Sequence, residues 1–233
     1  RILLLRIVVS CVGFPCLQPP PPATALSWSR PVAAPTPARA IATGAPAHQR
    51  SKTGGGGAPP ALPKTSESPQ LLRIRHSMSH VMAMAVQKLF PKAQVTIGPW
   101  TESGFYYDFD SPDPFSESDL KAIKKEMIRS INKKLPLERL EVSRAEAEAR
   151  IRAQNEPYKL EILAGITEPI TLYTLGADWW DLCAGPHVAN TGDLNPKAFE
   201  LESVAGAYWR GDENNAQLQR IYGTAWELSL IHI

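Results

Sequence analysis

The segment LLRIRHSMSHVMAMAVQKLF, residues 71–90, decides the fold around which the rest of the chain is arranged. Its apolar residues recur at the three- and four-residue spacing of an amphipathic helix, which places them on one stripe. The stripe consists of Ile74, Met78, Val81, Met82, Ala85 and Leu89. Pro91 ends the pattern, because proline cannot continue a helix. The sequence therefore predicts one long helix that buries this stripe in a core.

His76 and His80 are four residues apart on this helix and so share a face. At about 100° per residue, that face lies nearly opposite the apolar stripe. The two histidines are therefore not part of the main core. They face either solvent or a second environment, and a histidine pair at this spacing is a weak signal for either.

Segments of strand and helix character follow the long helix. Strands are predicted over residues 93–100, 104–110, 137–143, 168–175 and 197–209. A second helix, 116–135, begins at the capping pair Ser116 and Asp119, and a third begins at Ser143 and stops before Pro157. Strands and helices do not alternate regularly. The sequence also contains no Gly-rich phosphate-binding loop of the Walker or dinucleotide type. The pattern predicts an α+β fold, an antiparallel sheet with packed helices.

The stretch WWDLCAGPH, residues 179–187, places Cys183 four residues before His187 around a Gly-Pro turn. With His76 and His80 these residues form a set of three imidazoles and one thiol. Such a set can hold zinc in a tetrahedral shell, or it can hold and activate water without a metal. The residues leave both chemistries open. In the plainer alternative, Cys183 is a small buried hydrophobe and His187 caps backbone groups in a turn.

Residues 1–68 differ in composition from the rest of the chain. No Asp or Glu occurs up to Lys64, while Arg and Lys are spread among many Pro, Ala and Ser residues. Such a segment cannot bury enough apolar surface to fold, so we expect a disordered leader. Its basic, acid-free character is typical of a transit peptide and predicts import into chloroplast or mitochondrion. A secretory signal is the alternative, and the apolar opening is too short to span a membrane.

Charge and cysteine content narrow the classes of partner. Seven of the 25 basic residues and no acidic residue lie up to Lys64, which leaves 18 basic against 23 acidic residues beyond it and a net charge of −5 there. A generally basic nucleic-acid surface is therefore excluded. Residues 120–136 are a local exception, where Lys and Arg crowd one helix; this is either a solvated face or a phosphate contact. Cys11 and Cys16 fall in the leader, so Cys183 is the one thiol of the folded part.

Several stretches of the chain resemble successive parts of threonyl-tRNA synthetases of the organellar, plant type. More narrowly, they are similar to the editing domain, the second additional domain shared with alanyl-tRNA synthetases. The resemblance extends from Leu71 to Trp226. It rests on RHSMSHVMAMAVQKLFP (75–91), IGPWTESGFYYDFD (97–110), NEPYKLEIL (155–163), WWDLCAGPHVANTG (179–192) and ESVAGAYWRGDENNAQLQRIYGTAW (202–226).

The resemblance implies an enzyme that hydrolyses seryl-tRNA(Thr), the product of mischarging by a threonine–tRNA ligase. A synthetic site that binds threonine cannot strongly reject serine, because a missing methyl group is worth only about 1–3 kcal/mol. A second, smaller pocket admits serine and excludes threonine. In the family, His76, His80, Cys183 and His187 match residues that line this pocket. We expect His76 and Lys159 to position or activate water, while His80, Cys183 and His187 shape the pocket.

Two further residues match substrate-binding positions of the family. Asp181 would take the amine of the substrate, and Tyr107 lies in or near the pocket. Without the resemblance, the simpler interpretation is that Lys159 is a surface lysine, Asp181 a turn aspartate and Tyr107 a strand-edge tyrosine. The alanyl type holds zinc at the positions of the His/Cys set, whereas the threonyl type works without it, so zinc bound by the His/Cys set stays an alternative.

The chain departs from the full family pattern after residue 226. The family continues into a class II catalytic domain, which uses ATP, Mg²⁺ and Zn²⁺ and through which the full-length parent forms a homodimer. The sequence therefore predicts an editing domain over 69–210, the start of a linker over 211–226 and a non-native tail over 227–233. We expect a fragment that carries only ester hydrolysis. Alternatives are a freestanding hydrolase that edits in trans, and a non-catalytic zinc- or tRNA-binding module.

Overall fold

The structure is a computed structural model that describes residues 62–227. The predicted leader up to residue 61, with Cys11 and Cys16, lies outside the described residues, as does the tail from residue 228. The last residues of the expected leader, 62–68, fall within the described part of the chain. Thr65–Glu67 form a short 3-10 helix, and Thr65 is buried, with its hydroxyl accepting a hydrogen bond from Arg75 Nη1 at 2.5 Å.

The described residues form an α+β fold, as predicted. Its helices are α1 (Pro69–Leu89), α2 (Glu117–Asn132), α3 (Arg144–Ala153) and α4 (Pro157–Gly165). Its strands are β1 (Gln94–Val95), β2 (Phe105–Asp110), β3 (Leu137–Val142), β4 (Ile170–Leu175), β5 (Trp179–Leu182), β6 (Phe199–Tyr208) and β7 (Gln217–Ala225). None of the helices between residues 62 and 227 has the length and apolar character needed to cross a bilayer.

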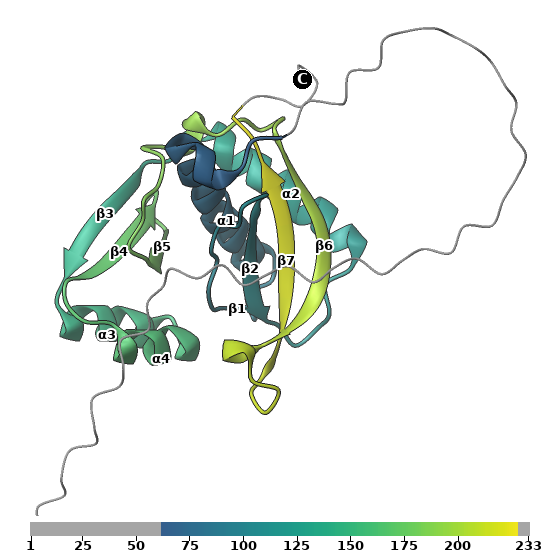
Figure 1. The fold of residues 1–233 in the computed structure, drawn as a ribbon. Coiled ribbons are helices and arrows are strands. Elements are labelled where there is room, and N and C mark those ends of the chain that lie inside the picture. Colours follow the sequence, from purple (N-terminus) through teal and green to yellow (C-terminus); the bar gives the residue numbers. More distant parts are fainter. Residues whose placement is uncertain (1–61, 228–233) are drawn as a thin grey trace, which may run out of the picture. The chain divides into compact units, whose positions relative to one another are not determined.

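The strands form two antiparallel sheets where the sequence predicted one. The first sheet has the order β1-β2-β7-β6 and the second the order β3-β4-β5. Figure 1 shows α1 and α2 against one face of the first sheet, with the second sheet beside α1. The cluster of candidate site residues described below lies where α1, β2 and β5 meet.

Helix α1 supplies the centre of the main core, as its stripe predicted. Ile74, Met78 and Val81 are at most 4% exposed and pack in one cluster with the inward side chains of β2. Leu89, placed on the stripe by its spacing, is instead 38% exposed, because it is the last residue of the helix. Ser68 begins the helix by accepting the Leu71 N–H, and Pro69 occupies the first turn, where no N–H is needed.

Helix α2 and helix α3 begin where their capping residues predict. The Ser116 hydroxyl accepts the Asp119 N–H and the Asp119 carboxylate accepts the Ser116 N–H, which is a complete capping box. Ser143 accepts the Glu146 N–H in the same way at α3. The predicted first short strand shrinks to the two residues of β1.

Three elements differ from the sequence-based expectation. Helix α4 was not predicted, because its nine residues have no apolar stripe of their own. Strand β5, just before the Gly-Pro turn, covers residues for which no strand was predicted. Strand β7 lies between β2 and β6, paired with β6 along its whole length and with β2 over residues 219–223, so Gln217–Ala225 belong to the sheet. The linker start expected over residues 211–226 therefore includes a strand of the sheet.

Candidate functional site

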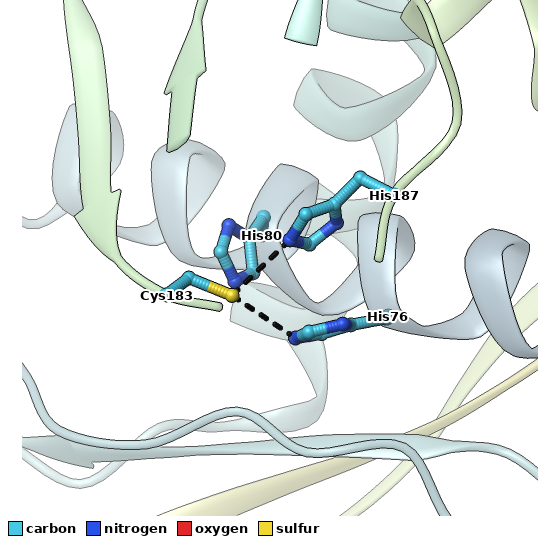
Figure 2. A group of neighbouring side chains, drawn as sticks. All are labelled: His76, His80, Cys183 and His187. Carbon is cyan, nitrogen blue, oxygen red and sulfur yellow. Dashed lines mark hydrogen bonds between the residues drawn. The ribbon is translucent and has the colours of Figure 1, made fainter. Parts of the chain in front are cut away.

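Helix α1 and the loop after β5 bring four predicted residues together. Figure 2 shows His76 and His80 projecting from α1 toward Cys183 and His187 on that loop. One ligand atom from each of the four lies within 4.8 Å of the other three. The second environment expected for the α1 histidines is therefore the end of the β3-β4-β5 sheet.

The loop after β5 is held in place by backbone contacts. The Cys183 N–H donates to the Thr171 carbonyl at 3.1 Å, and the Val188 N–H donates to Ser77 Oγ of α1 at 3.0 Å. Gly185 turns the chain with a φ of +78°, and a Cβ there would lie 2.4 Å from the Tyr173 hydroxyl. Only glycine fits both constraints, so the Cys183–His187 spacing depends on Gly185.

Hydrogen bonds fix the orientation of the thiol and two of the rings. His76 Nδ1 lies 3.2 Å from the Pro186 carbonyl, which only accepts, so we assign the proton to Nδ1. His76 Nε2 therefore presents its lone pair to Cys183 Sγ, 3.5 Å away. Cys183 Sγ also accepts the Gly185 N–H at 3.2 Å and lies 3.3 Å from His187 Nε2.

All four groups of this cluster are neutral at physiological pH. Burial lowers the pKa of His76 to about 4, and burial also lowers the pKa values of His80 and His187, helped by the neighbouring imidazoles. Burial raises the pKa of the Cys183 thiol to about 12, with the Asp181 charge adding to the effect. Neutral imidazoles keep lone pairs that can accept a proton or bind a metal.

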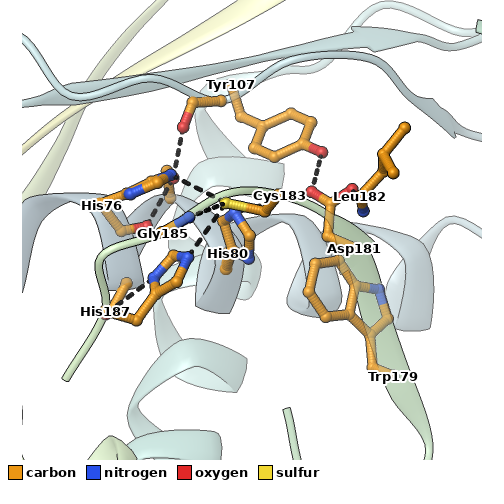
Figure 3. A network of polar contacts seen from close by, with 12 residues as sticks. His76, His80, Tyr107, Trp179, Asp181, Leu182, Cys183, Gly185 and His187 are labelled. Atoms are coloured by element: carbon orange, nitrogen blue, oxygen red, sulfur yellow. Dashed lines mark hydrogen bonds and ion pairs between the residues drawn. The ribbon is translucent and has the colours of Figure 1, made fainter. Parts of the chain in front are cut away.

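A second cluster of buried polar groups adjoins the first. The Tyr107 hydroxyl donates to Asp181 Oδ2 at 2.7 Å (Figure 3), and Lys159 Nζ donates to the Tyr107 hydroxyl at 3.0 Å. Lys159 Nζ also forms an ion pair with Asp181 Oδ1, and both side chains are at most 5% exposed. His80 Nε2 lies 3.7 Å from Asp181 Oδ2 and links the two clusters.

The structure thus brings all seven predicted site residues into one region between α1, β2, α4 and β5, where five are buried and His76 and Cys183 are half-buried. The plainer readings of Lys159, Asp181 and Tyr107 do not fit, because the three side chains are 4%, 3% and 0% exposed and bonded to one another. Burying a charged pair costs desolvation free energy. A buried pair beside three neutral imidazoles is typical of a functional site.

Sequence reasoning missed residues that support the cluster. Ser77 Oγ lies 3.1 Å from His187 Nδ1, and the Trp179 ring packs edge-on against His80 with centroids 5.7 Å apart. The Trp179 indole N–H donates to Gln87 Oε1 at 2.7 Å, which fixes the ring. Ser77 lies between the two α1 histidines and Trp179 begins the WWDLC stretch, so proximity in sequence was the available signal.

The side chains of the first cluster, His76, His80, Cys183 and His187, are of the types that bind zinc. Three imidazoles and one thiol are common zinc ligands, and a tetrahedral shell separates such donors by about 3.3–3.8 Å. The distances from Cys183 Sγ to His76 Nε2 and His187 Nε2, 3.5 and 3.3 Å, lie in this range. The widest separation in the set is 4.8 Å, so one donor would have to move inward by about an ångström to complete a tetrahedral shell.

The chain is similar in sequence to known proteins. Residues 170–222 match the family described as "Threonyl and Alanyl tRNA synthetase second additional domain". The chain is 83% identical over 169 residues to the threonine–tRNA ligase of Synechococcus sp. (strain WH7803), which covers 72% of this chain and 28% of that protein. The corresponding ligase of Synechocystis sp. (strain ATCC 27184 / PCC 6803 / Kazusa) is 75% identical over 167 residues, with 72% and 28% covered. The chain therefore spans about 28% of the length of these relatives.

Proposed function

We propose that the folded part of this chain belongs to the threonyl-tRNA synthetases, carries the second additional domain of the threonyl and alanyl enzymes and hydrolyses seryl-tRNA(Thr). The reaction cleaves the ester bond between serine and the terminal ribose of the tRNA. The observation that carries the proposal is the buried Lys159–Asp181 pair beside neutral imidazoles. Such a site offers a cation, a carboxylate and proton acceptors within one small volume.

The residues divide naturally between binding and chemistry. The Asp181 carboxylate forms an ion pair with the ammonium group of serine. Tyr107 fixes the orientation of this carboxylate through its 2.7 Å hydrogen bond. His76 Nε2 and Lys159 Nζ position the attacking water, with His76 accepting its proton and Lys159 stabilising the negative charge on the ester oxygen. His80, Cys183 and His187 form the walls that exclude the methyl group of threonine.

Zinc at the first cluster is a second form of the proposal, favoured by the 3.3 and 3.5 Å donor distances. His76, His80, Cys183 and His187 would hold the ion, which would supply Lewis acidity toward the ester carbonyl. Metal analysis of the purified chain and hydrolysis after chelation separate the two forms. Bound zinc with no turnover would instead support the non-catalytic zinc- or tRNA-binding module.

The activity of the longer protein is a separate proposal. The named relatives are threonine–tRNA ligases, so we propose that the intact protein charges tRNA(Thr) with threonine, using ATP in a catalytic domain and acting as a homodimer. The basic, acid-free leader composition supports import into chloroplast or mitochondrion.

The proposed hydrolysis is tested with the full chain and seryl-tRNA(Thr). We expect His76→Ala and Cys183→Ala to lose at least about 100-fold in rate, because the first removes the acceptor of the water proton and the second removes the thiol that contacts the His76 and His187 rings. Lys124→Ala is the matched control, because Lys124 is a partly exposed lysine that pairs with Glu200 away from the site. Equal rates for wild type and both site variants would contradict the proposal.

A further inference from the structure

Helix α4 carries Lys159 into the site but has little stability of its own. It is nine residues long, begins at Pro157 and has no side-chain hydrogen bond at its N-cap. Isolated helices of this length do not persist in water. The position of Lys159 Nζ against Asp181 therefore depends on what holds α4 from outside.

The C-terminal half of α4 is held by the second core. Leu163 packs with Ala147, Ile151 and Ile170. Arg144 donates to the Leu163 carbonyl at 2.9 Å and to the Ile166 carbonyl at 2.5 Å. These contacts fix the end of the helix that lies beyond Lys159.

The N-terminal half is held on its outer face by the end of the β6–β7 hairpin, which lies beside α4 in Figure 1. The Trp209 indole N–H donates to Glu161 Oε2 at 2.9 Å, and Arg210 pairs with Glu161 Oε1 at 3.0 Å. The Trp209 ring packs edge-on against Tyr158 with centroids 5.1 Å apart. The Tyr158 hydroxyl in turn donates to Asp110 Oδ2 at the end of β2 at 2.6 Å.

Helical geometry links these outer contacts to the site. Residues two apart on a helix point about 200° apart, so Glu161 faces the hairpin while Lys159 faces Asp181. The hairpin end is built for this contact at a conformational cost, because Arg210 adopts a left-handed φ of +57° beside Gly211 at +73°. Trp209 itself is 6% exposed, and its carbonyl accepts from Asn215 Nδ2 at 3.0 Å.

We propose that Trp209, Glu161 and Tyr158 form a clasp that positions Lys159 for the reaction. The clasp residues touch neither substrate nor reacting atoms; they act through the placement of α4. The kinetic consequence rests on the proposed hydrolase function, whereas the placement of Lys159 does not. Because a displacement of about 1 Å can cost 100-fold in rate, loosening the clasp should lower the rate constant for the chemical step and leave KM unchanged.

The first experiment reads the placement of Lys159 without any substrate. In the full chain, the Lys159 ammonium group is buried and ion-paired, so its protons exchange slowly and give a resolved ¹⁵N resonance, assigned by its loss in Lys159→Met. We expect Glu161→Ala and Trp209→Phe to broaden or remove this resonance. Glu200→Ala is the matched control, because it removes a charged contact between β6 and α2 instead. A retained resonance in both clasp variants would overturn the proposal.

The second experiment is a double-mutant cycle on seryl-tRNA(Thr) hydrolysis, with folding of each variant checked by circular dichroism. Glu161→Ala should lower kcat about 10- to 100-fold in the wild-type background and have no further effect in Lys159→Met. If Glu161→Ala lowers kcat by the same factor in Lys159→Met as in wild type, the clasp does not act through Lys159. If wild type cleaves nothing, the proposed function fails while the ammonium resonance still decides the clasp. Glu161 is exposed, so its variant should fold even if Trp209→Phe does not.

Discussion

The contacts of single residues determine whether Tyr107 reaches Asp181. The Tyr107 ring lies against Gly98, where a Cβ would come within 2.0 Å of Tyr107 Cδ2. The carbonyl of Gly98 accepts from Ser79 Oγ at 2.7 Å, which ties this turn to α1. The absence of a side chain at Gly98 thus lets a fully buried tyrosine bond with both Asp181 and Lys159.

Gly98→Ala should displace the Tyr107 ring. We expect the free energy of unfolding to fall by about 1–3 kcal/mol, the usual cost of overpacking a core, and seryl-tRNA hydrolysis to fall with it. Gly165→Ala is the matched control, because a Cβ there meets nothing within 4 Å. Urea unfolding of the two variants measures the difference, and equal stabilities would contradict the role given to Gly98.

Glu156, at the start of α4, should make stability depend on pH. Burial raises its pKa to about 7 from the usual 4.5, although the Val95 N–H bond opposes this. The folded state therefore holds the proton more tightly, so the stabilisation is complete below pH 4.5 and is lost as the pH rises through 7. The stability of wild type relative to Glu156→Gln should fall by about 1–3 kcal/mol across this range. A difference that does not change with pH in urea unfolding would refute the assignment.

Among the elements, α1 joins the core to the site and to the end of β7. Its Arg75 is 0% exposed and donates from Nε to the Ala225 carbonyl at 3.1 Å and from Nη1 to the Glu102 carbonyl at 2.7 Å. Its guanidinium also lies over the Trp226 ring, 4.7 Å from the centroid. One side chain therefore fixes where the first turns of α1 lie relative to the sheet.

Arg75→Leu should leave these buried carbonyls without donors. We expect a loss of about 2–4 kcal/mol in the free energy of unfolding. Arg73→Leu tests whether this loss is specific, since Arg73 is exposed on the same helix. Thermal and urea unfolding should place the Arg73 variant close to wild type; a comparable loss in both would mean that burial of Arg75 is not the cause.

The elements also show how far the sequence determines the fold. Helices α1 and α2 could be predicted because an apolar period and a capping box occur within each segment. Helix α4 and strand β7 could not, because their places are set by partners far away: β7 pairs with β2, more than 100 residues earlier. For the site, the α1 spacing indicated His76 and His80. Lys159, Asp181 and Tyr107 meet across separations of 52 and 74 residues, and only the family resemblance indicated them.

At the scale of the whole molecule, two sheets converge on one buried set of groups. The first sheet supplies Tyr107, the second supplies Asp181 and the loop with Cys183 and His187, and α1 lies between them with its two histidines. The β6–β7 hairpin and α4 connect the far ends of the two halves through Trp209 and Glu161. The geometry of the site therefore depends on the contacts that hold the two sheets together.

The most direct test of the central claim is the ratio of hydrolysis rates for seryl-tRNA(Thr) and threonyl-tRNA(Thr), measured with the full chain under identical conditions. A pocket that excludes one methyl group should cleave the seryl ester about 10- to 200-fold faster. That preference, together with the loss of seryl-tRNA hydrolysis in His76→Ala, is the result we expect. Equal rates for the two esters, or cleavage of neither by the folded chain, would contradict the assignment of this cluster as a serine-selective editing site.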